Sequence, residues 1–327
     1  GIFFLLIANS FFISTHAQVT SSNKNINEYL LKQWNASTGF QGNGFLHITQ
    51  SPDGYIWITG FKGLTKFDGF SFTFYNRKNT PELQSNGTNG IFADKDTTVW
   101  FGTRESGLIS YKKGKFTKHG GGNFNIEFIS RMDNDHLWIG TQSHGLYLYN
   151  TTNRQWKSAS SELVQNTGIT TISKSSSGDY FIGTESNGLI IYSKGRFTKY
   201  TIPPFNKIST VRAILHLSNK DVIVGTPDAT YILSNNQVKA ITELDGVAVY
   251  SLIIDNKRDI WAGTTNGLWR KAYNEPLFIK RTADISQIHI QEVISDRDGS
   301  IWLATYRNGL YQLRDSKFSN ITLGTGV

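Results

Sequence analysis

The stretch LWIGTQSHGLYLY (residues 137–149) contains a tryptophan, a Gly-Thr pair and, after a short polar interval, a Gly-Leu pair. Taken alone it resembles a compact ligand site, because a glutamine, a serine and a histidine lie among aromatic residues. The same plan recurs in VWFGTRESGLISY (99–111), YFIGTESNGLIIY (180–192), IWAGTTNGLWR (260–270) and IWLATYRNGLYQL (301–313), with variant forms in IWITGFKGLTKF (56–67) and VIVGTPDATYIL (222–233). Most of the stretch therefore belongs to a repeated scaffold.

Seven copies align on the tryptophan or the residue that replaces it: Trp57, Trp100, Trp138, Phe181, Ile223, Trp261 and Trp302. Five of the eight tryptophans in the chain occupy this one position. The copies follow one another at intervals of about forty residues, which is typical of radially repeated β folds. Four strands of about five residues, with their turns, fill such a repeat. The sequence therefore predicts an all-β fold, a seven-bladed β-propeller of four-stranded antiparallel blades.

The second strand of each repeat is apolar on both faces, as in Leu137-Trp138-Ile139. Such a strand must be buried on both sides, and blades stacked around an axis provide that burial. Asn-Gly and Asp-Gly pairs flank the strand and supply the positive φ angles of tight turns. We therefore interpret the Trp, Gly and Leu positions as packing residues, and expect the glycine near the end of the strand to permit a close backbone approach or a bulge.

The N-terminus differs in kind from the repeats. Residues 2–13, IFFLLIANSFFI, form an apolar run too short to span a membrane, and Thr15 and Ala17 occupy the −3 and −1 positions of a cleavage site. We expect residues 1–17 to be a signal peptide without its basic n-region and residues 18–43 to be a lead-in. Residues 44–323 then form the propeller, and residues 324–327 begin a link to a missing C-terminal region.

The two ends of the chain are alternatives for closing the ring. Residues 29–35 or residues 317–323 could supply the outer strand of the last blade. Pairing of the chain ends would remove exposed sheet edges. Both alternatives remain open at the level of sequence.

The charge of the chain gives weak information about its partners. Thirty-three basic and 25 acidic residues leave a formal charge of +8, and cysteine is absent, so disulfides do not stabilise the fold. Because the mature part is expected to be exported, nucleic acid is not an expected partner. The charge suits an acidic ligand such as an anionic polysaccharide, but also an ordinary solvated surface, which we favour.

Few residue patterns indicate catalysis. The seven histidines are scattered, and the chain has neither a phosphate-binding loop nor a nucleophile-elbow motif. Asp94-x-Asp96, Asp133-x-Asp135 and Asp296-x-Asp298 resemble fragments of calcium loops, but they fall at one turn of the repeat and lack the later glutamate. Turn formation is the favoured interpretation. We expect no catalytic residue, no metal and no cofactor in this segment.

The residues between the Gly-Thr and Gly-Leu pairs change from copy to copy. All these turns join the second and third strands, so they would form a ring on one face of a propeller, and loops on a rigid scaffold often carry binding residues. Arginine, glutamine, histidine and tyrosine in these turns could bind a sugar or a carboxylate. The candidate ligand-binding residues are Lys62, Arg104, Glu105, Gln142, His144, Glu185, Asn187, Asp228, Asn266, Tyr306 and Arg307.

The repeat resembles the two-component regulator propeller repeat. The resemblance is clearest in DNKRDIWAGTTNGLWR (255–270) and DRDGSIWLATYRNGLYQL (296–313), and residues 29–69 are similar to the start of such sensor ectodomains. It covers nearly all of the chain after the apolar N-terminal run.

The resemblance implies a function in signal transduction. It implies the periplasmic sensor propeller of an inner-membrane histidine kinase or hybrid two-component protein, with an oligosaccharide among the expected ligands. The full-length sensor is expected to be a homodimer that contacts the membrane only through its missing C-terminal region. The alternative is an exported propeller enzyme, a lyase or glycosidase acting on a polysaccharide.

Overall fold

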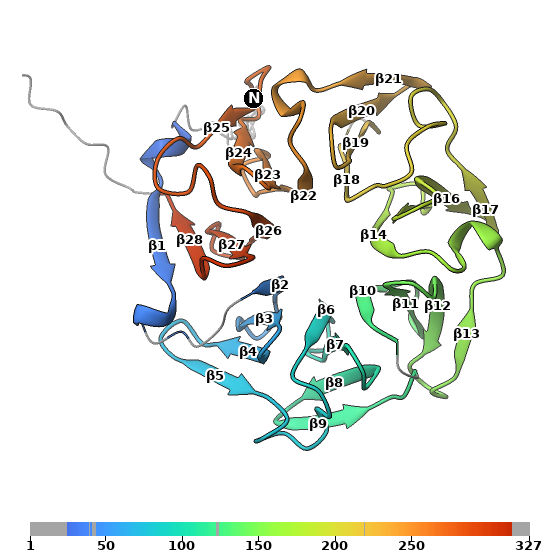
Figure 1. The fold of residues 1–327 in the computed structure, drawn as a ribbon, viewed down its shortest axis with the longest axis vertical. Helices are drawn as coiled ribbons and strands as arrows, with labels where there is room; N and C mark the ends of the chain where they lie inside the picture. Colours follow the sequence, from blue (N-terminus) through green and yellow to red (C-terminus); the bar gives the residue numbers. More distant parts are fainter. Residues whose placement is uncertain (1–24, 39, 41–43, 122–123, 219, 316–327) are drawn as a thin grey trace, which may run out of the picture.

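The computed structural model describes residues 25–315 except 39, 41–43, 122–123 and 219. Its strands form seven antiparallel sheets of four strands each, arranged as a ring around a central axis (Figure 1). Residues of the innermost strands line a hollow on this axis, the channel. The predicted seven-bladed propeller is confirmed. The proposed signal peptide, the alternative closing strand 317–323 and the link 324–327 lie outside the described residues.

Each blade runs from an innermost strand beside the channel to an outermost strand at the rim (Figure 1). Blade 1 contains β2 (Phe45–Gln50), β3 (Ile56–Gly60), β4 (Gly63–Phe67) and β5 (Phe72–Tyr75). Blade 2 contains β6 (Thr88–Ala93), β7 (Val99–Thr103), β8 (Leu108–Lys112) and β9 (Lys115–Lys118). Blade 3 contains β10 (Ile126–Arg131), β11 (His136–Thr141), β12 (Leu146–Asn150) and β13 (Trp156–Ser158). Blade 4 contains β14 (Ile169–Lys174), β15 (Tyr180–Thr184), β16 (Leu189–Ser193) and β17 (Arg196–Lys199). Blade 5 contains β18 (Ala213–His216), β19 (Val222–Gly225), β20 (Thr230–Ser234) and β21 (Gln237–Ala240). Blade 6 contains β22 (Val249–Ile254), β23 (Ile260–Thr264), β24 (Gly267–Lys271) and β25 (Ile279–Lys280), and blade 7 contains β26 (Ile290–Ser295), β27 (Ile301–Thr305), β28 (Leu310–Arg314) and β1 (Leu30–Trp34).

The helices of the described residues are short 3-10 turns. They are η1 (Ile26–Glu28), η2 (Ala36–Thr38), η3 (Glu162–Val164) and η4 (Thr242–Leu244). Within residues 25–315, apart from the gaps, no helix is long and apolar enough to cross a membrane.

The hydrophobic core lies between neighbouring blades. Trp138 of blade 3 is 1% exposed and packs in one cluster with Ile169 and Ile182 of blade 4. The equivalent residues of the other blades are also buried, except Phe181, which is half-buried. The repeat position is therefore a packing position, as its pattern predicts.

The glycine of the repeat permits neighbouring blades to approach closely. A Cβ atom placed on Gly140 would lie 2.8 Å from the Cβ of Ile169 on β14 of the next blade. At Gly102 the same construction places the atom 2.5 Å from the Cβ of Ile126. Any side chain at these positions would separate the blades, which explains why glycine recurs there.

In blades 6 and 7 an aspartate of the turn before the second strand holds the tryptophan of the scaffold. In blade 7, Asp296 Oδ1 accepts hydrogen bonds from the backbone N–H groups of Asp298 and Ser300, at 3.0 and 2.8 Å. Its Oδ2 accepts a third bond from the buried indole Nε1 of Trp302, at 2.7 Å. Asp255 accepts the same bond from Trp261 in blade 6, at 2.8 Å. These contacts support the turn interpretation and add a link to the core that the sequence did not predict.

The N-terminal lead-in closes the ring. β1 pairs antiparallel with β28, with Leu31 opposite Leu313 and Trp34 opposite Leu310. The Trp34 ring stacks on Trp302 with centroids 5.3 Å apart. Of the two alternatives for the outer strand of blade 7, residues 29–35 are therefore the segment that the structure places there.

Candidate functional site at the mouth of the channel

The innermost strands share an irregularity that directs side chains into the channel. Most have two apolar residues separated by two others, such as Ile126-Glu127-Phe128-Ile129 on β10, whereas Thr88 takes the first apolar position in β6. Pairing with the second strand shifts register at this point in β2, β6, β10, β14, β22 and β26. A bulge of this kind re-aims side chains, so two consecutive residues reach the channel where regular strands would alternate.

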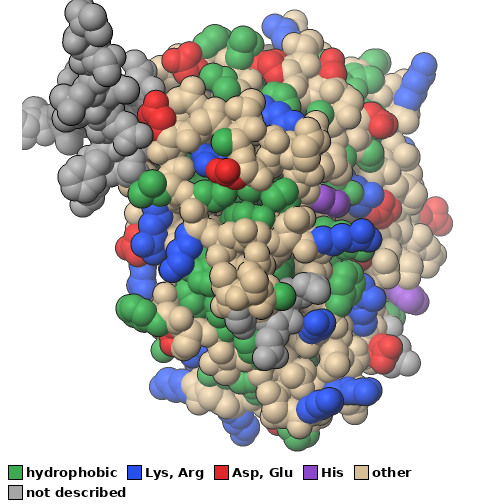
Figure 2. Space-filling view, turned by 60° about the vertical axis from the view of Figure 1, so that its left-hand side comes forward, with side chains coloured by type: hydrophobic (Ala, Val, Ile, Leu, Met, Phe, Trp, Pro, Cys, Tyr) green, Lys and Arg blue, Asp and Glu red, His purple; other side chains and the backbone are tan. Residues whose placement is uncertain are grey.

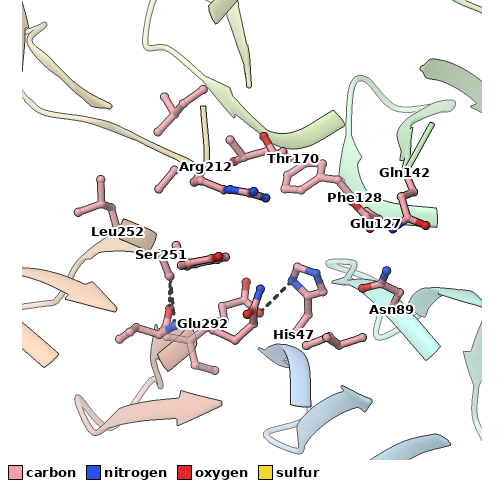
Figure 3. A pocket seen from close by; sticks show the side chains of 18 of the residues that line it. His47, Asn89, Glu127, Phe128, Gln142, Thr170, Arg212, Ser251, Leu252 and Glu292 are labelled. Atoms are coloured by element: carbon pink, nitrogen blue, oxygen red, sulfur yellow. Dashed lines mark hydrogen bonds and ion pairs between the residues drawn. The ribbon is translucent and has the colours of Figure 1, made fainter. Parts of the chain in front are cut away.

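The bulged positions line a cavity of about 450 Å³ at the mouth of the channel (Figure 3). This volume lies in the range of roughly 300–1,000 Å³ that is usual for small-molecule sites. Its polar lining consists of His47, Asn89, Arg104, Asn125, Glu127, Gln142, Thr170, Thr171, Glu185, Arg212, Tyr250, Ser251, Gln291 and Glu292. Deeper residues of the same strands are aliphatic, including Ile214, Ile253 and Ile294.

His47 and Glu292 form one charged pair in this lining. The His47 Nδ1 atom lies 3.4 Å from Glu292 Oε2, which also accepts a hydrogen bond from the backbone N–H of Ile48 at 2.5 Å. Burial alone would lower the pKa of His47, but the carboxylates of Glu292 and Glu127 outweigh it and raise the pKa above the ordinary 6.5. The contact with Glu292 therefore favours the charged form of the His47 imidazole.

Arg212 and Glu185 form a second pair across the cavity. Arg212 Nη1 donates to Glu185 Oε1 at 2.6 Å, and its guanidinium carbon lies 5.4 Å from the centre of the Tyr250 ring. Glu185 is in the turn between the second and third strands of blade 4, whereas Arg212 immediately precedes β18 of blade 5. The pair thus joins the loop ring to the ring of innermost strands.

A chain of carboxamides connects blades 2 and 3 at the mouth. Asn89 Nδ2 donates to Asn125 Oδ1 at 3.3 Å, and Asn125 Nδ2 donates to Gln142 Oε1 at 2.8 Å. Glu127 lies beside this chain, and burial raises the pKa of its carboxyl, with Glu185 adding to the shift and His47, Arg212 and Asn89 opposing it. The site is dense in donors and acceptors with fixed positions.

The structure brings three of the candidate residues of the sequence analysis into this cavity, namely Arg104, Gln142 and Glu185. The other eight do not line it: Lys62, Glu105, His144, Asn187, Asp228, Asn266, Tyr306 and Arg307. Some of these have local partners: Asn187 Nδ2 donates to the Leu163 carbonyl oxygen at 2.9 Å, and Asn266 Oδ1 accepts from Lys280 Nζ at 2.9 Å. Their part in binding stays a prediction.

Sequence reasoning missed most of the lining. The missed polar residues include His47, Asn89, Asn125, Glu127, Arg212, Tyr250, Gln291 and Glu292. Alignment of the copies on the innermost strand could have found all of these except Asn125, because the two residues between the flanking pair differ in chemistry from blade to blade while the flanking residues are nearly all apolar. Alignment of the copies on the second strand identified only the candidate residues in the turns that follow it.

A larger hollow of about 700 Å³ lies at the opposite turns, between blades 1, 6 and 7. Asp296 in its lining already accepts three hydrogen bonds within its turn and core. Lys257 is paired with Asp315, which also lines it. These three charged groups thus serve the scaffold, and the channel mouth, with its lining from all seven blades, is the stronger candidate site.

Comparison with known proteins gives one partial sequence match and several structures that share the propeller fold. No protein-family model matches the chain. A 94-residue segment is 30% identical to "Histidine kinase P4" of Formosa agariphila, a match that covers 26% of this chain and 7% of that protein. The chain therefore spans a small fraction of the curated relative that it matches.

Solved structures share the propeller over most of this chain. The extracellular domains of two hybrid two-component systems of B. thetaiotaomicron superpose with TM-scores of 0.72 and 0.75, at 22% and 20% identity, over 90% and 88% of this chain. The chain spans 40% and 42% of those domains. A catalytically inactive virginiamycin B lyase from Staphylococcus aureus, with quinupristin, superposes with a TM-score of 0.74 at 16% identity, over 88% of this chain and 100% of that one. Together with the repeat pattern, the sensor matches support the two-component regulator propeller family.

Proposed function

We propose that this propeller is the ligand-sensing part of a membrane-bound two-component sensor, exported to the periplasm. It recognises an oligosaccharide or another extracellular ligand at the channel mouth and passes the signal to an output region of a longer protein, a histidine kinase or a hybrid. The likeness to extracellular domains of hybrid two-component systems carries the proposal. The polar cavity of the channel supplies the binding site that such a role requires.

The arrangement of the site suits binding on a rigid scaffold. Its side chains come from all seven blades, which are fixed by packing between sheets and by the closure of β1 onto β28. A preorganised site of this kind loses little conformational entropy when a ligand binds. Occupation would bridge several blades and stabilise the ring as a whole.

The test is to incubate the chain with enzymatic digests of polysaccharides and to record both its melting temperature and the products. A sensor shows a ligand-dependent rise in melting temperature and leaves the ligand chemically unchanged. In the full-length parent, the same ligand changes the autophosphorylation rate of the kinase. Turnover of the ligand by the chain, or a kinase rate that no binding ligand alters, would overturn the sensory role.

An exported propeller enzyme is the second candidate. Two observations favour it: the fold is shared with a lyase, and the His47–Glu292 pair lines the cavity, where an imidazole and a carboxylate could act as acid and base. The enzyme hypothesis predicts product formation that His47→Ala abolishes while binding persists. If the wild-type chain yields no product from any polysaccharide that it binds, the enzyme hypothesis fails.

A further inference from the structure

We propose that the channel mouth selects the uncharged, polyhydroxylated end of a sugar chain and disfavours acidic polysaccharides, an inference that rests on the proposed sensory function. The site has many polar groups but little net charge of its own. This selectivity differs from what the overall charge of +8 would suggest.

The charged groups of the cavity largely neutralise one another. Glu185 is paired with Arg212, and Glu292 with His47. The Arg104 guanidinium carbon lies 4.5 Å from the centre of the Phe61 ring. Glu127 has its hydrogen-bonding neighbour in Asn89, a neutral amide. Three carboxylates thus oppose two guanidiniums and one imidazole, which leaves no excess of positive charge to hold an anion.

The basic excess of the protein lies elsewhere on its surface. Figure 2 shows Lys and Arg side chains spread over the visible face rather than gathered in one patch. Interactions between exposed charges are largely screened beyond about 10 Å in a salt-containing medium, so basic groups far from the cavity act weakly on a ligand within it. The surface therefore does not override the selectivity of the cavity.

The remaining groups match hydroxyls. The carboxamides of Asn89, Asn125 and Gln142 present both donors and acceptors along one wall. A sugar hydroxyl also donates and accepts, so planar amides and carboxylates can bind adjacent hydroxyls in pairs. An aromatic face offers a surface on which the apolar side of a sugar ring can pack, and Tyr250 of blade 6 belongs to the lining of the cavity.

The shape of the cavity indicates entry by the end of a chain. Polar residues line its mouth, while aliphatic residues such as Leu252, Ile253 and Ile294 lie deeper along the same strands. A volume of about 450 Å³ in a ring closed by seven blades holds a short terminal segment and gives no groove for an extended polymer.

The experiment is a calorimetric titration of the chain with two sets of short oligosaccharides. The neutral set contains gluco-, xylo-, manno-, galacto- and fructo-oligosaccharides, and the acidic set contains oligogalacturonates, oligoalginates and sulfated oligosaccharides. We expect at least one neutral member to bind at least about tenfold more tightly than any acidic one (about 1.4 kcal/mol). Its affinity should change less than about twofold between low and high salt, because no ion pair with the ligand is broken.

Two variants locate the binding. Glu127→Gln keeps the size of the side chain but removes its negative charge, and Asn125→Ala removes the middle amide of the Asn89–Asn125–Gln142 row. Each is expected to weaken the affinity for the neutral ligand about tenfold or more. The matched controls, Glu162→Gln and Asn134→Ala, alter exposed residues outside the cavity and should bind as the wild type does. Unchanged melting curves establish that each variant is folded.

The outcomes separate this inference from the sensory function. Tighter binding of an acidic member, no binding by the neutral set, or a neutral ligand that both cavity variants bind normally would overturn the inference and leave a sensor with another site. In another outcome, the cavity variants weaken binding but the kinase of the full-length parent does not respond to the ligand. That result would overturn the sensory function and leave the selectivity of the cavity intact.

Discussion

Replacement of Asp296 by alanine tests how the repeat links its turns to its core. The aspartate is 9% exposed and accepts three hydrogen bonds, one of them from the buried indole of Trp302, which is 4% exposed. Alanine removes all three acceptors and leaves the indole N–H buried without its partner, and an unsatisfied buried donor alone costs about 1–3 kcal/mol. With the two turn bonds added, we expect the free energy of unfolding to fall by about 3 kcal/mol.

The measurement is equilibrium unfolding in urea, followed by tryptophan fluorescence. Asp298→Ala, an exposed residue of the same turn, serves as the control and should change the free energy of unfolding by less than about 0.5 kcal/mol. Blades 2 and 3 lack this bond, because the buried Trp100 Nε1 and Trp138 Nε1 have no hydrogen-bond partner, so Asp296→Ala tests the link in blade 7 specifically. A loss below about 1 kcal/mol for Asp296→Ala, or equal losses for both variants, would refute it.

Three further changes test the scaffold. Gly140→Ala should lower stability by about 1–3 kcal/mol in urea unfolding, since the added methyl group would overlap Ile169 of the next blade; an unchanged midpoint would contradict the close approach. Deletion of residues 25–34 should lower the melting temperature and promote aggregation seen by light scattering, because the edge of β28 becomes exposed; an unchanged melting temperature without aggregation would show that closure is dispensable. Burial lowers the pKa of His119 from 6.5 to about 4, so the neutral ring stabilises the fold fully above pH 6.5 and this contribution is lost as pH falls towards 4; His119→Gln should remove about 2 kcal/mol of that pH dependence, and equal pH profiles would refute it.

The repeat made the fold predictable from the sequence. A second strand such as Leu137-Trp138-Ile139 has no polar face and must be buried on both sides. Seven such strands in one chain are buried in this way when their sheets stack against one another. The closure of the ring was not predictable, because β1 pairs with β28 across nearly the whole sequence and either chain end had suitable residues. The pairing of strands far apart in the sequence produces no periodic pattern within either strand that would identify its partner.

The site was predictable in part. Arg104, Gln142 and Glu185 lie in the turns that sequence variation singled out, and they line the cavity. Most of the lining belongs to the bulged innermost strands, where Glu127 reaches the channel because pairing shifts register beside Ile126. A bulge depends on the partner strand, so the sequence of a single strand does not show which of its residues it redirects.

The central claim is that the channel mouth binds an uncharged sugar end. The most direct test is a crystal structure of the chain with the neutral oligosaccharide that titration selects. We expect a sugar ring in the cavity, hydrogen-bonded to Glu127 and the amides of Asn125 and Gln142, beside Tyr250. A ligand held elsewhere on the propeller, with the channel mouth unoccupied, would contradict it.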